Sequence, residues 1–404
     1  MSIMKDIFKS VKLAPSDPIL GLNEKFNSDN RLNKVNLGVG VYYDKDGRIP
    51  LMEAVCKSEA FLASKKLPRG YLPIDGISNY NKNAMKLLFG ENSNKIEEGR
   101  ALTVQTLGGT GALKIGADFL YQLLPNSKVL ISNPSWENHR AIFEKSGFLV
   151  DTYPYYDPAN NNIAFDRMLE SLNTTASGTI VVLHACCHNP TGIDPTVKQW
   201  REIVETIKER NLIPFLDIAY QGFGDGLSED AYVVRMFSDM DIPSFISSSF
   251  SKSFALYGER VGALTITTNN RDETNRALSQ IKRLIRSNYS NPPTHGASIV
   301  NHVLSSDDLF EIWENELSDM RNRIKLMRKN LINKIGKHSS KKDFSFVLDQ
   351  RGMFSYSGLT SHQVDILREQ YGIYAVSSGR ICVAALNDNN IDLVASSISQ
   401  VLDK

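Results

Sequence analysis

The sequence contains little cysteine, and its cysteines show no metal-binding spacing. Among 404 residues only Cys56, Cys186, Cys187 and Cys382 carry thiols, and no CxxC pair suggests a zinc site. Two adjacent cysteines rarely pair with each other, so a disulfide framework is not expected. The pattern favours reduced, mostly buried thiols and a protein without a metal centre, as is usual in the cytosol.

The sequence also lacks an excess of charge and a long apolar run. Its 46 basic and 45 acidic residues give a formal net charge of +1, which provides no general attraction to nucleic acid or to an anionic membrane. No run of about 18 uncharged apolar residues predicts a membrane span. Residues 1–18 have neither the apolar centre nor the cleavage site of a secretory signal. We therefore expect a cytoplasmic protein without nucleic-acid or membrane partners.

Short apolar runs alternate with helical stretches between residues 100 and 265. Seven runs have the length and composition of buried strands: 101–107, 128–134, 149–155, 179–185, 212–220, 244–250 and 261–267. Strands that are apolar on both faces are typical of a mostly parallel sheet covered by helices. The sequence therefore predicts an α/β fold with a mostly parallel sheet in a large domain.

The carboxyl-terminal part has a different pattern. Residues 309–336 repeat apolar side chains at spacings of three and four, which predicts a long amphipathic helix. Helical residues 361–372, a strand-like stretch at 373–386 and a closing helix at 390–404 follow. This order suggests a smaller α+β domain. The loop-rich segment up to about residue 48 belongs with that domain or reaches toward a partner subunit.

Glycines follow the first strand of the predicted sheet, at the edge where open α/β sheets bind ligands. The strand runs into Gly108, Gly109, Thr110 and Gly111 before a helix, and bare N–H groups at the positive end of a helix can hold a phosphate. A tight strand-to-helix turn explains the glycines equally well. No GK[ST] follows, and the next strand ends in Asn133 rather than in an acidic residue, which disfavours a P-loop and a dinucleotide site.

Three further strand ends carry groups suited to a planar ligand. Trp136, in NPSWENH, offers a flat face to a ring, although a core tryptophan is the simpler alternative. Asn189, in HACCHNPTG, places an amide at the sheet edge unless it only forms an Asn-Pro turn. Asp217 ends a strongly apolar strand, where a carboxylate needs a cationic ligand or a structural salt bridge. Tyr220 follows it by three residues.

Lys252 lies just beyond the strand at 244–250, near Ser249, Ser251 and, further along, Arg260. In a serine-rich loop such a lysine is ordinarily surface charge. One ligand nevertheless satisfies all of these strand ends, because it carries a phosphate, a flat ring, a protonated ring nitrogen for Asp217, a ring hydroxyl and an aldehyde for the lysine. That ligand is pyridoxal 5′-phosphate (PLP), and a lysine captured as an imine is reactive at neutral pH.

The sequence resembles the aspartate aminotransferases, which are fold-type I PLP-dependent enzymes, and among them the subgroup of animal and proteobacterial enzymes. The matching motifs run in order along nearly the whole chain: APSDPILGL, VNLGVGVY, GYLPIDG, GGTGALKIGADFL, NPSWENH, HNPTG, DIAYQGF, SFSKSFALYGERVG, SNPP, GMFSYSGL and SSGRICVA. The resemblance implies the reaction L-aspartate + 2-oxoglutarate = oxaloacetate + L-glutamate, by a ping-pong mechanism through an aldimine on Lys252.

The resemblance also implies a role for each site residue. Lys252 binds the cofactor and later moves the proton at the substrate Cα. Asp217 pairs with the pyridine nitrogen, and Tyr220 and Asn189 hold the ring oxygen. The remaining implied cofactor contacts are Trp136 on the ring, His139 behind the aspartate, and Gly109, Thr110, Ser249, Arg260 and the partner subunit's Tyr71 at the phosphate.

For the substrate, the resemblance implies that Arg380, Asn189, Trp136 and the Gly40 backbone bind the α-carboxylate. Arg286 from the neighbouring subunit binds the distal carboxylate, and two guanidinium forks select dicarboxylate amino and keto acids. A substrate without that carboxylate leaves a desolvated arginine unpaired, at a cost of roughly 3–5 kcal/mol.

The implied assembly is a homodimer with composite active sites. Residues 1–14 are expected to form an arm on the partner, residues 15–48 and 320–404 the small domain, and residues 49–319 the large PLP-binding domain. The peptide bonds before Pro134 and Pro190 are expected to be cis, as in this fold. Two departures are visible: Gly108 stands where many relatives have a phosphate-binding serine, and Tyr356 stands where phenylalanine is usual.

Several alternatives remain beside this interpretation. An aromatic or broad-specificity aminotransferase of the same subgroup is the main one, because a mobile Arg286 can make room for an aromatic side chain. A PLP-dependent decarboxylase or β-lyase is disfavoured by the paired arginines. A non-catalytic PLP-fold protein is disfavoured because Lys252, Asp217 and Arg380 are all present.

Overall fold

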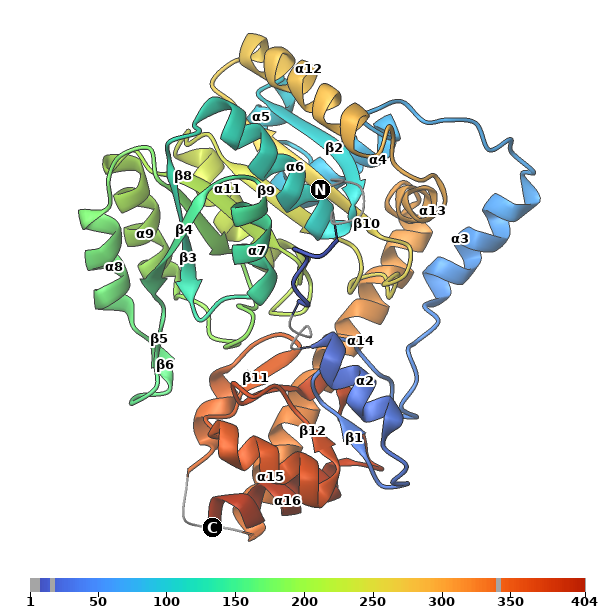
Figure 1. Ribbon diagram of the computed structural model, residues 1–404. Coiled ribbons are helices and arrows are strands. Elements are labelled where there is room, and N and C mark those ends of the chain that lie inside the picture. Colours follow the sequence, from blue (N-terminus) through green and yellow to red (C-terminus); the bar gives the residue numbers. More distant parts are fainter. Residues whose placement is uncertain (1–7, 15–18, 339–342, 404) are drawn as a thin grey trace.

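The seven predicted strands form one sheet in the computed structural model, which describes residues 8–14, 19–338 and 343–403 (Figure 1). They are β2 Ala101–Leu107, β3 Lys128–Asn133, β4 Leu149–Pro154, β7 Ile180–His184, β8 Ile213–Ile218, β9 Phe245–Ser249 and β10 Val261–Thr267. Their order is β2-β10-β9-β8-β7-β3-β4, in which β10 is antiparallel to both neighbours and the other pairs are parallel. The predicted mixed, mostly parallel sheet is confirmed.

Both faces of the sheet are buried, because successive side chains of each strand point to opposite faces and both faces pack against helices. In β7, Ile180 and Val182 pack into one core, whereas Val181 and Leu183 pack into the other. Helices α6, α7 and α12 cover the first face, and α4, α8, α9 and α11 contribute to the core on the second. The helices of this part are α3 Glu53–Ser64, α4 Ser78–Phe89, α5 Asn94–Glu97, α6 Gly108–Leu123, α7 Glu137–Lys145, α8 Phe165–Thr174, α9 Val197–Glu209, α10 Leu227–Asp230, α11 Tyr232–Asp239, α12 Arg271–Asn288 and α13 His295–Leu304.

A second group of elements lies below the sheet in Figure 1, joined to it by the long helix α14 Asp307–His338. Its members are α2 Leu20–Ser28, β1 Val35–Asn36, η1 Ser345–Asp349, β11 Phe354–Tyr356, α15 Ser361–Tyr371, β12 Ile373–Tyr374, β13 Arg380–Cys382, η2 Val383–Ala385 and α16 Ile391–Asp403. The helices expected at 309–336, 361–372 and 390–404 are thus confirmed. A hairpin of β5 Tyr156–Asp157 and β6 Asn162–Ile163 extends from the sheet toward this group.

The amino-terminal segment joins the carboxyl-terminal elements through backbone pairing. Strand β1 pairs in parallel with β12, so Val35 lies opposite Ile373. For this reason we retain the division into residues 15–48 plus 320–404 and residues 49–319 as a proposal. Residues 1–7 of the expected arm, and residues 15–18, lie outside the described residues.

The stretch at 373–386 differs from the expected strand. It contains two short strands, β12 and β13, separated by a turn and followed by the 3-10 helix η2. The turn forms because Gly379, at a φ of +83°, donates its N–H to the Val376 carbonyl at 2.8 Å. The turn lets β13 pair with β11, which places Arg380 opposite Tyr356.

Two other expectations concern the backbone and the membrane. The peptide bonds before Pro134 and Pro190 are both cis, as expected. None of the helices in the described part of the chain is long and apolar enough to cross a membrane.

Candidate active site

A pocket opens beyond the carboxyl ends of the central strands, between the sheet and the second group of elements. It is lined by Ile19, Gly40, Gly109, Thr110, Leu113, Trp136, His184, Asn189, Asp217, Ala219, Tyr220, Ser249, Ser251, Lys252, Arg260, Phe354 and Arg380. Every cofactor or substrate residue expected from this subunit lies on its wall, except His139, which lies directly behind Asp217. Tyr71 and Arg286, which were assigned to the neighbouring subunit, do not line it.

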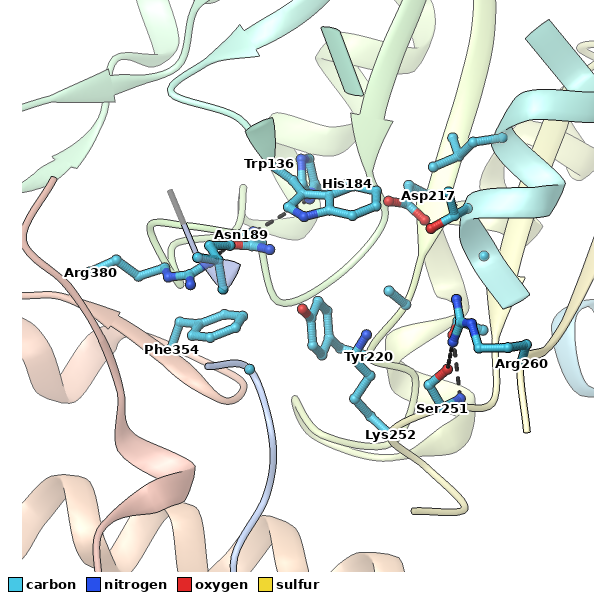
Figure 2. Close-up of a pocket in the computed structure, with 17 residues that line it drawn as sticks. Trp136, His184, Asn189, Asp217, Tyr220, Ser251, Lys252, Arg260, Phe354 and Arg380 are labelled. Atoms are coloured by element: carbon cyan, nitrogen blue, oxygen red, sulfur yellow. Dashed lines mark hydrogen bonds between the residues drawn. The ribbon is translucent and has the colours of Figure 1, made fainter. Parts of the chain in front are cut away.

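Lys252 extends into the middle of the pocket from the turn after β9 (Figure 2). Its Nζ lies 5.3 Å from the centroid of the Tyr220 ring. Burial lowers the pKa of Lys252 to about 8; the Asp217 carboxylate opposes this shift and the Arg260 guanidinium adds to it. At neutral pH the amine therefore has a much larger neutral fraction than an ordinary lysine, as a nucleophile or a base requires.

Asp217 is held through both of its carboxylate oxygens. The Ser247 hydroxyl donates to Oδ1 at 2.6 Å, and His139 Nε2 donates to Oδ2 at 2.9 Å. With Nε2 as the donor, the other ring nitrogen of His139 accepts from the Ser135 hydroxyl at 2.9 Å. Burial raises the pKa of Asp217, but the hydrogen bonds from His139 and Ser247 help to bring it below the ordinary value.

Arg380 lies at one end of the pocket, and Arg260 lies at the other (Figure 2). Arg380 is 1% exposed. It donates from Nη1 to Asn189 Oδ1 at 3.1 Å and from Nη2 to the Gly38 carbonyl at 2.7 Å, and its guanidinium carbon lies 4.3 Å from the centroid of the Phe354 ring. Its Nε is buried without a partner among the described residues. A buried cation with an unused donor favours an anionic ligand with two oxygens, such as a carboxylate.

The other positively charged end of the pocket lies at the start of α6. Gly108 has a φ of +68°, and a Cβ there would come within 2.5 Å of Arg260 Nη2. The guanidinium, which also donates to Ser251 Oγ at 3.1 Å, thus occupies the space that a side chain at position 108 would need. Helix N–H groups, a guanidinium and the hydroxyls of Ser249 and Ser251 meet here, as a phosphate site requires.

A comparison with known proteins decides the family. The family model described as "Aminotransferase class I and II" matches residues 33–398 of this chain. The chain belongs to this aminotransferase family. Its fold is accordingly the fold-type I α/β architecture that the sequence predicted.

The relatives of this aminotransferase are named for different substrates. It is 57% identical to an aspartate aminotransferase of Pseudomonas aeruginosa, over 98% of this chain and 100% of that protein. It is 47% identical to an aromatic-amino-acid aminotransferase of Escherichia coli, with the same coverage. A crystal structure of an aromatic-amino-acid aminotransferase from Burkholderia pseudomallei, covalently bound to PLP, is 60% identical, with a TM-score of 0.96 over 98% of this chain and 99% of that one.

Several residues of the aminotransferase site were not predicted from the sequence. Ser247, which bonds Asp217, was detectable because alternate residues of a strand share a face, so Ser247 faces the same way as Ser249. Phe354 lies in a motif that carries the resemblance, but only the three-dimensional structure shows that Arg380 lies over its ring. His184 also lines the pocket, and burial keeps its pKa well below the ordinary value.

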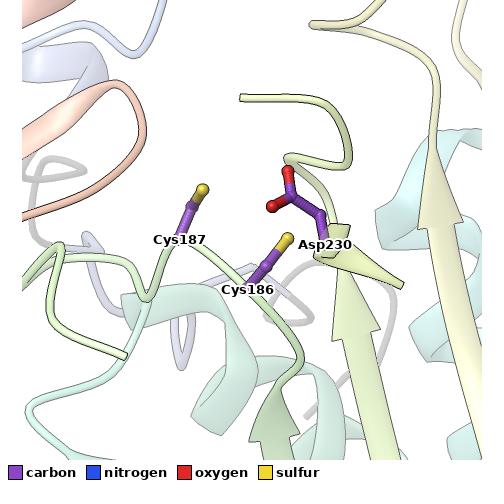
Figure 3. A group of neighbouring side chains, drawn as sticks. All are labelled: Cys186, Cys187 and Asp230. Atoms are coloured by element: carbon purple, nitrogen blue, oxygen red, sulfur yellow. The ribbon is translucent and has the colours of Figure 1, made fainter. Parts of the chain in front are cut away.

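Cys186, Cys187 and Asp230 lie close together outside the residues that line the pocket (Figure 3). Ligand atoms of Cys186, Cys187 and Asp230 lie within 4.8 Å of one another, and all three residues are buried. However, Asp230 already accepts three backbone N–H groups from residues 222–225. The hydrogen bond between Cys186 and Cys187, together with burial, raises the pKa of the Cys186 thiol. We assign no metal to this cluster. All four cysteines are free, with Cys382 also buried and Cys56 exposed, which agrees with the expected buried thiols.

The lowered pKa of Lys252 predicts a pH-dependent gain of stability on substitution. In the unfolded chain the lysine pKa is about 10.4, so the folded, cofactor-free protein binds this proton more weakly, and that costs stability at neutral pH. We expect Lys252→Met to raise the melting temperature of the cofactor-free protein at pH 7. The gain should shrink as the pH rises from about 8 toward 10.4, because the wild type recovers stability in that window.

The measurement is a set of thermal melts of cofactor-free protein between pH 7 and pH 10. Lys198→Met is a suitable control, because Lys198 is an exposed lysine on α9. The control should show a small shift that does not change across this range. A gain for Lys252→Met that is equally independent of pH would contradict the assigned environment of the amine.

Proposed function

We propose that this aminotransferase transfers the amino group of L-aspartate to 2-oxoglutarate, giving oxaloacetate and L-glutamate, with PLP bound to Lys252. The observation that carries the proposal is the position of Lys252 in the middle of one pocket, between two anion-binding ends. One end is formed by Arg380, and the other by the start of α6 with Arg260. We also propose a cytoplasmic location, which the four free cysteines support.

The residues present fit the cofactor. The start of α6, Arg260 and Ser251 would hold its phosphate, and Asp217 would hold the proton at its ring nitrogen. Trp136 is placed on the pocket wall to cover a ring. Tyr220 remains a hydroxyl donor, because burial raises its pKa although the charge of Arg380 opposes this. Each charged group of the cofactor thus has a complementary group in the pocket.

When bound, PLP supplies an aldehyde that condenses with amines and a protonated ring that withdraws electrons from bonds at the substrate Cα. The residues of the chain perform the remaining tasks. Lys252, with its pKa near 8, would remove the proton from the substrate Cα and deliver it to the cofactor carbon that carries the aldehyde. Asp217, ionised by its two hydrogen bonds, keeps the ring nitrogen protonated.

Arg380 would bind the α-carboxylate of the amino acid. The Nε that lacks a partner in the described structure and the adjacent N–H groups form the fork that a carboxylate matches. Asn189 is well placed to help, because its Oδ1 already accepts from Arg380 Nη1 and so fixes the guanidinium. Gly40, on the wall of the pocket, would contribute its backbone.

The distal carboxylate requires a second cation, and we propose that the partner subunit supplies it. Arg286 is exposed near the end of α12, where it hydrogen-bonds the Ser290 hydroxyl, and Tyr71 is 95% exposed. Neither lines the pocket of its own subunit. Leu51 and Leu67 are 88% and 63% exposed in the same region of the sequence as Tyr71. A homodimer that buries these side chains would bring Tyr71 and Arg286 to the other subunit's pocket.

An aromatic-amino-acid aminotransferase is the second candidate. The observation in its favour is the apolar part of the pocket wall, where Ile19, Leu113 and Phe354 could contact a ring. The name of the Burkholderia pseudomallei relative points the same way. The charge at position 286 favours aspartate, because an apolar side chain cannot pair with a guanidinium.

Substitution of Arg286 tests the substrate preference. We expect the wild type to have a higher kcat/KM for aspartate than for phenylalanine. Arg286→Ala should lower kcat/KM for aspartate by about two to three decades, because a buried ion pair with the distal carboxylate is lost. The value for phenylalanine should change far less. Arg283→Ala, an exposed arginine on the same helix, is the matched control. A wild type that prefers phenylalanine would favour the second candidate.

Combining one inactive and one strongly impaired variant tests the composite site. In a hybrid dimer of Lys252→Ala and Arg286→Ala subunits, one pocket has both defects, whereas the other combines an intact Lys252 with the partner's intact Arg286. We expect co-expression to restore aspartate turnover, up to one functional pocket per hybrid. If Arg286 acts within its own subunit, each pocket carries one defect and no activity returns, which would contradict the dimer proposal.

A further inference from the structure

A buried hydroxyl in the interior of the sheet faces Asp217. Ser247 lies in the middle of β9, is 0% exposed, and pairs across the parallel ladder with Asp217 of β8. Its hydroxyl lies 2.6 Å from Asp217 Oδ1. A hydroxyl in a strand core is costly unless it is hydrogen-bonded, and here the partner is the carboxylate itself.

The next residue provides a contrast on the same strand. Ser248 is also buried, at 5% exposure, but alternation turns its side chain to the opposite face of the sheet. Its Oγ has no hydrogen-bond partner among the described residues. Two neighbouring serines thus have the same chemistry and similar burial, and only one of them contacts Asp217.

With the Ser247 hydroxyl, each oxygen of the Asp217 carboxylate has a hydrogen-bond donor. His139 binds Oδ2 from α7, so a donor from each side prevents the carboxylate from rotating. The other titratable groups that face Asp217 are His184 from β7, Lys252 and Tyr220. Ser247 holds Oδ1 through a hydroxyl and is not one of these titratable groups.

We propose that Ser247 is a positioning residue that holds Asp217 in its productive orientation and lowers its proton affinity, so that the shared proton stays on the cofactor's ring nitrogen. This inference rests on the proposed function. A hydrogen bond to a carboxylate stabilises the charged form and makes it a weaker base. With the proton on the nitrogen, the ring keeps its positive charge and its power to withdraw electrons.

The test compares three variants of the PLP-loaded enzyme with the wild type. Ser247→Ala removes the hydroxyl, Ser247→Thr retains one, and Ser248→Ala is the matched control on the same strand. For each variant we would measure the pH midpoint of the visible absorbance of the bound cofactor, the Kd for PLP, and kcat and KM for aspartate. A thermal melt of each variant checks that it is folded.

For Ser247→Ala we expect the absorbance midpoint to move to higher pH, because a less positive ring makes the lysine-derived nitrogen more basic. We also expect kcat to fall by about tenfold, the size expected for a lost hydrogen bond to a charged group, with KM nearly unchanged because Arg380 is intact. Ser247→Thr should restore both values. Ser248→Ala should match the wild type.

The outcomes separate the two proposals. If the wild type itself forms no visible band with PLP, the proposed function fails. If the wild type forms the band and Ser247→Ala retains its midpoint and kcat, Ser247 does not position Asp217. A folded Ser247→Thr variant that behaves like Ser247→Ala, or a Ser248→Ala variant with the same shift, would also overturn the inference.

Discussion

The site depends on burying three charged groups, Asp217, Lys252 and Arg380, away from water without pairing them with one another. Asp217 is 7% exposed and Arg380 is 1% exposed, and both line the pocket. Lys252 lies between them with a pKa lowered mainly by burial. Such an arrangement is costly in an empty pocket, and a ligand with complementary charges offsets the cost. The binding energy of the cofactor and the destabilised amine are therefore two consequences of the same burial.

The sheet places these groups by its direction and register. Parallel strands bring His184, Asp217 and Ser247 into neighbouring positions, because they are paired across β7, β8 and β9. The antiparallel pair β11–β13 carries Phe354 and Arg380 to the opposite wall. Since these two walls come from parts of the chain joined by α14, their relative position sets the distance between amine and guanidinium.

Much of this arrangement was predictable from the sequence. The seven strands follow from short apolar runs, and the side of the sheet that binds ligands follows from the polar residues Asn189 and Asp217 at strand ends. The turn before Arg380 was read as strand, because the local β-rich composition hid the effect of a serine-glycine pair. Contacts between distant segments, such as Arg380 over Phe354, leave no local pattern. The space at Gly108 taken by Arg260 is likewise visible only in three dimensions.

The most direct test of the central claim is to locate the bond between cofactor and protein. The purified protein would be supplied with PLP, reduced with borohydride, digested and mapped by mass spectrometry. We expect a single phosphopyridoxyl group on Lys252, and a protein that becomes yellow before reduction. Modification of another lysine, or a protein that remains colourless with excess PLP, would contradict the role given to Lys252 and the chemistry built on it.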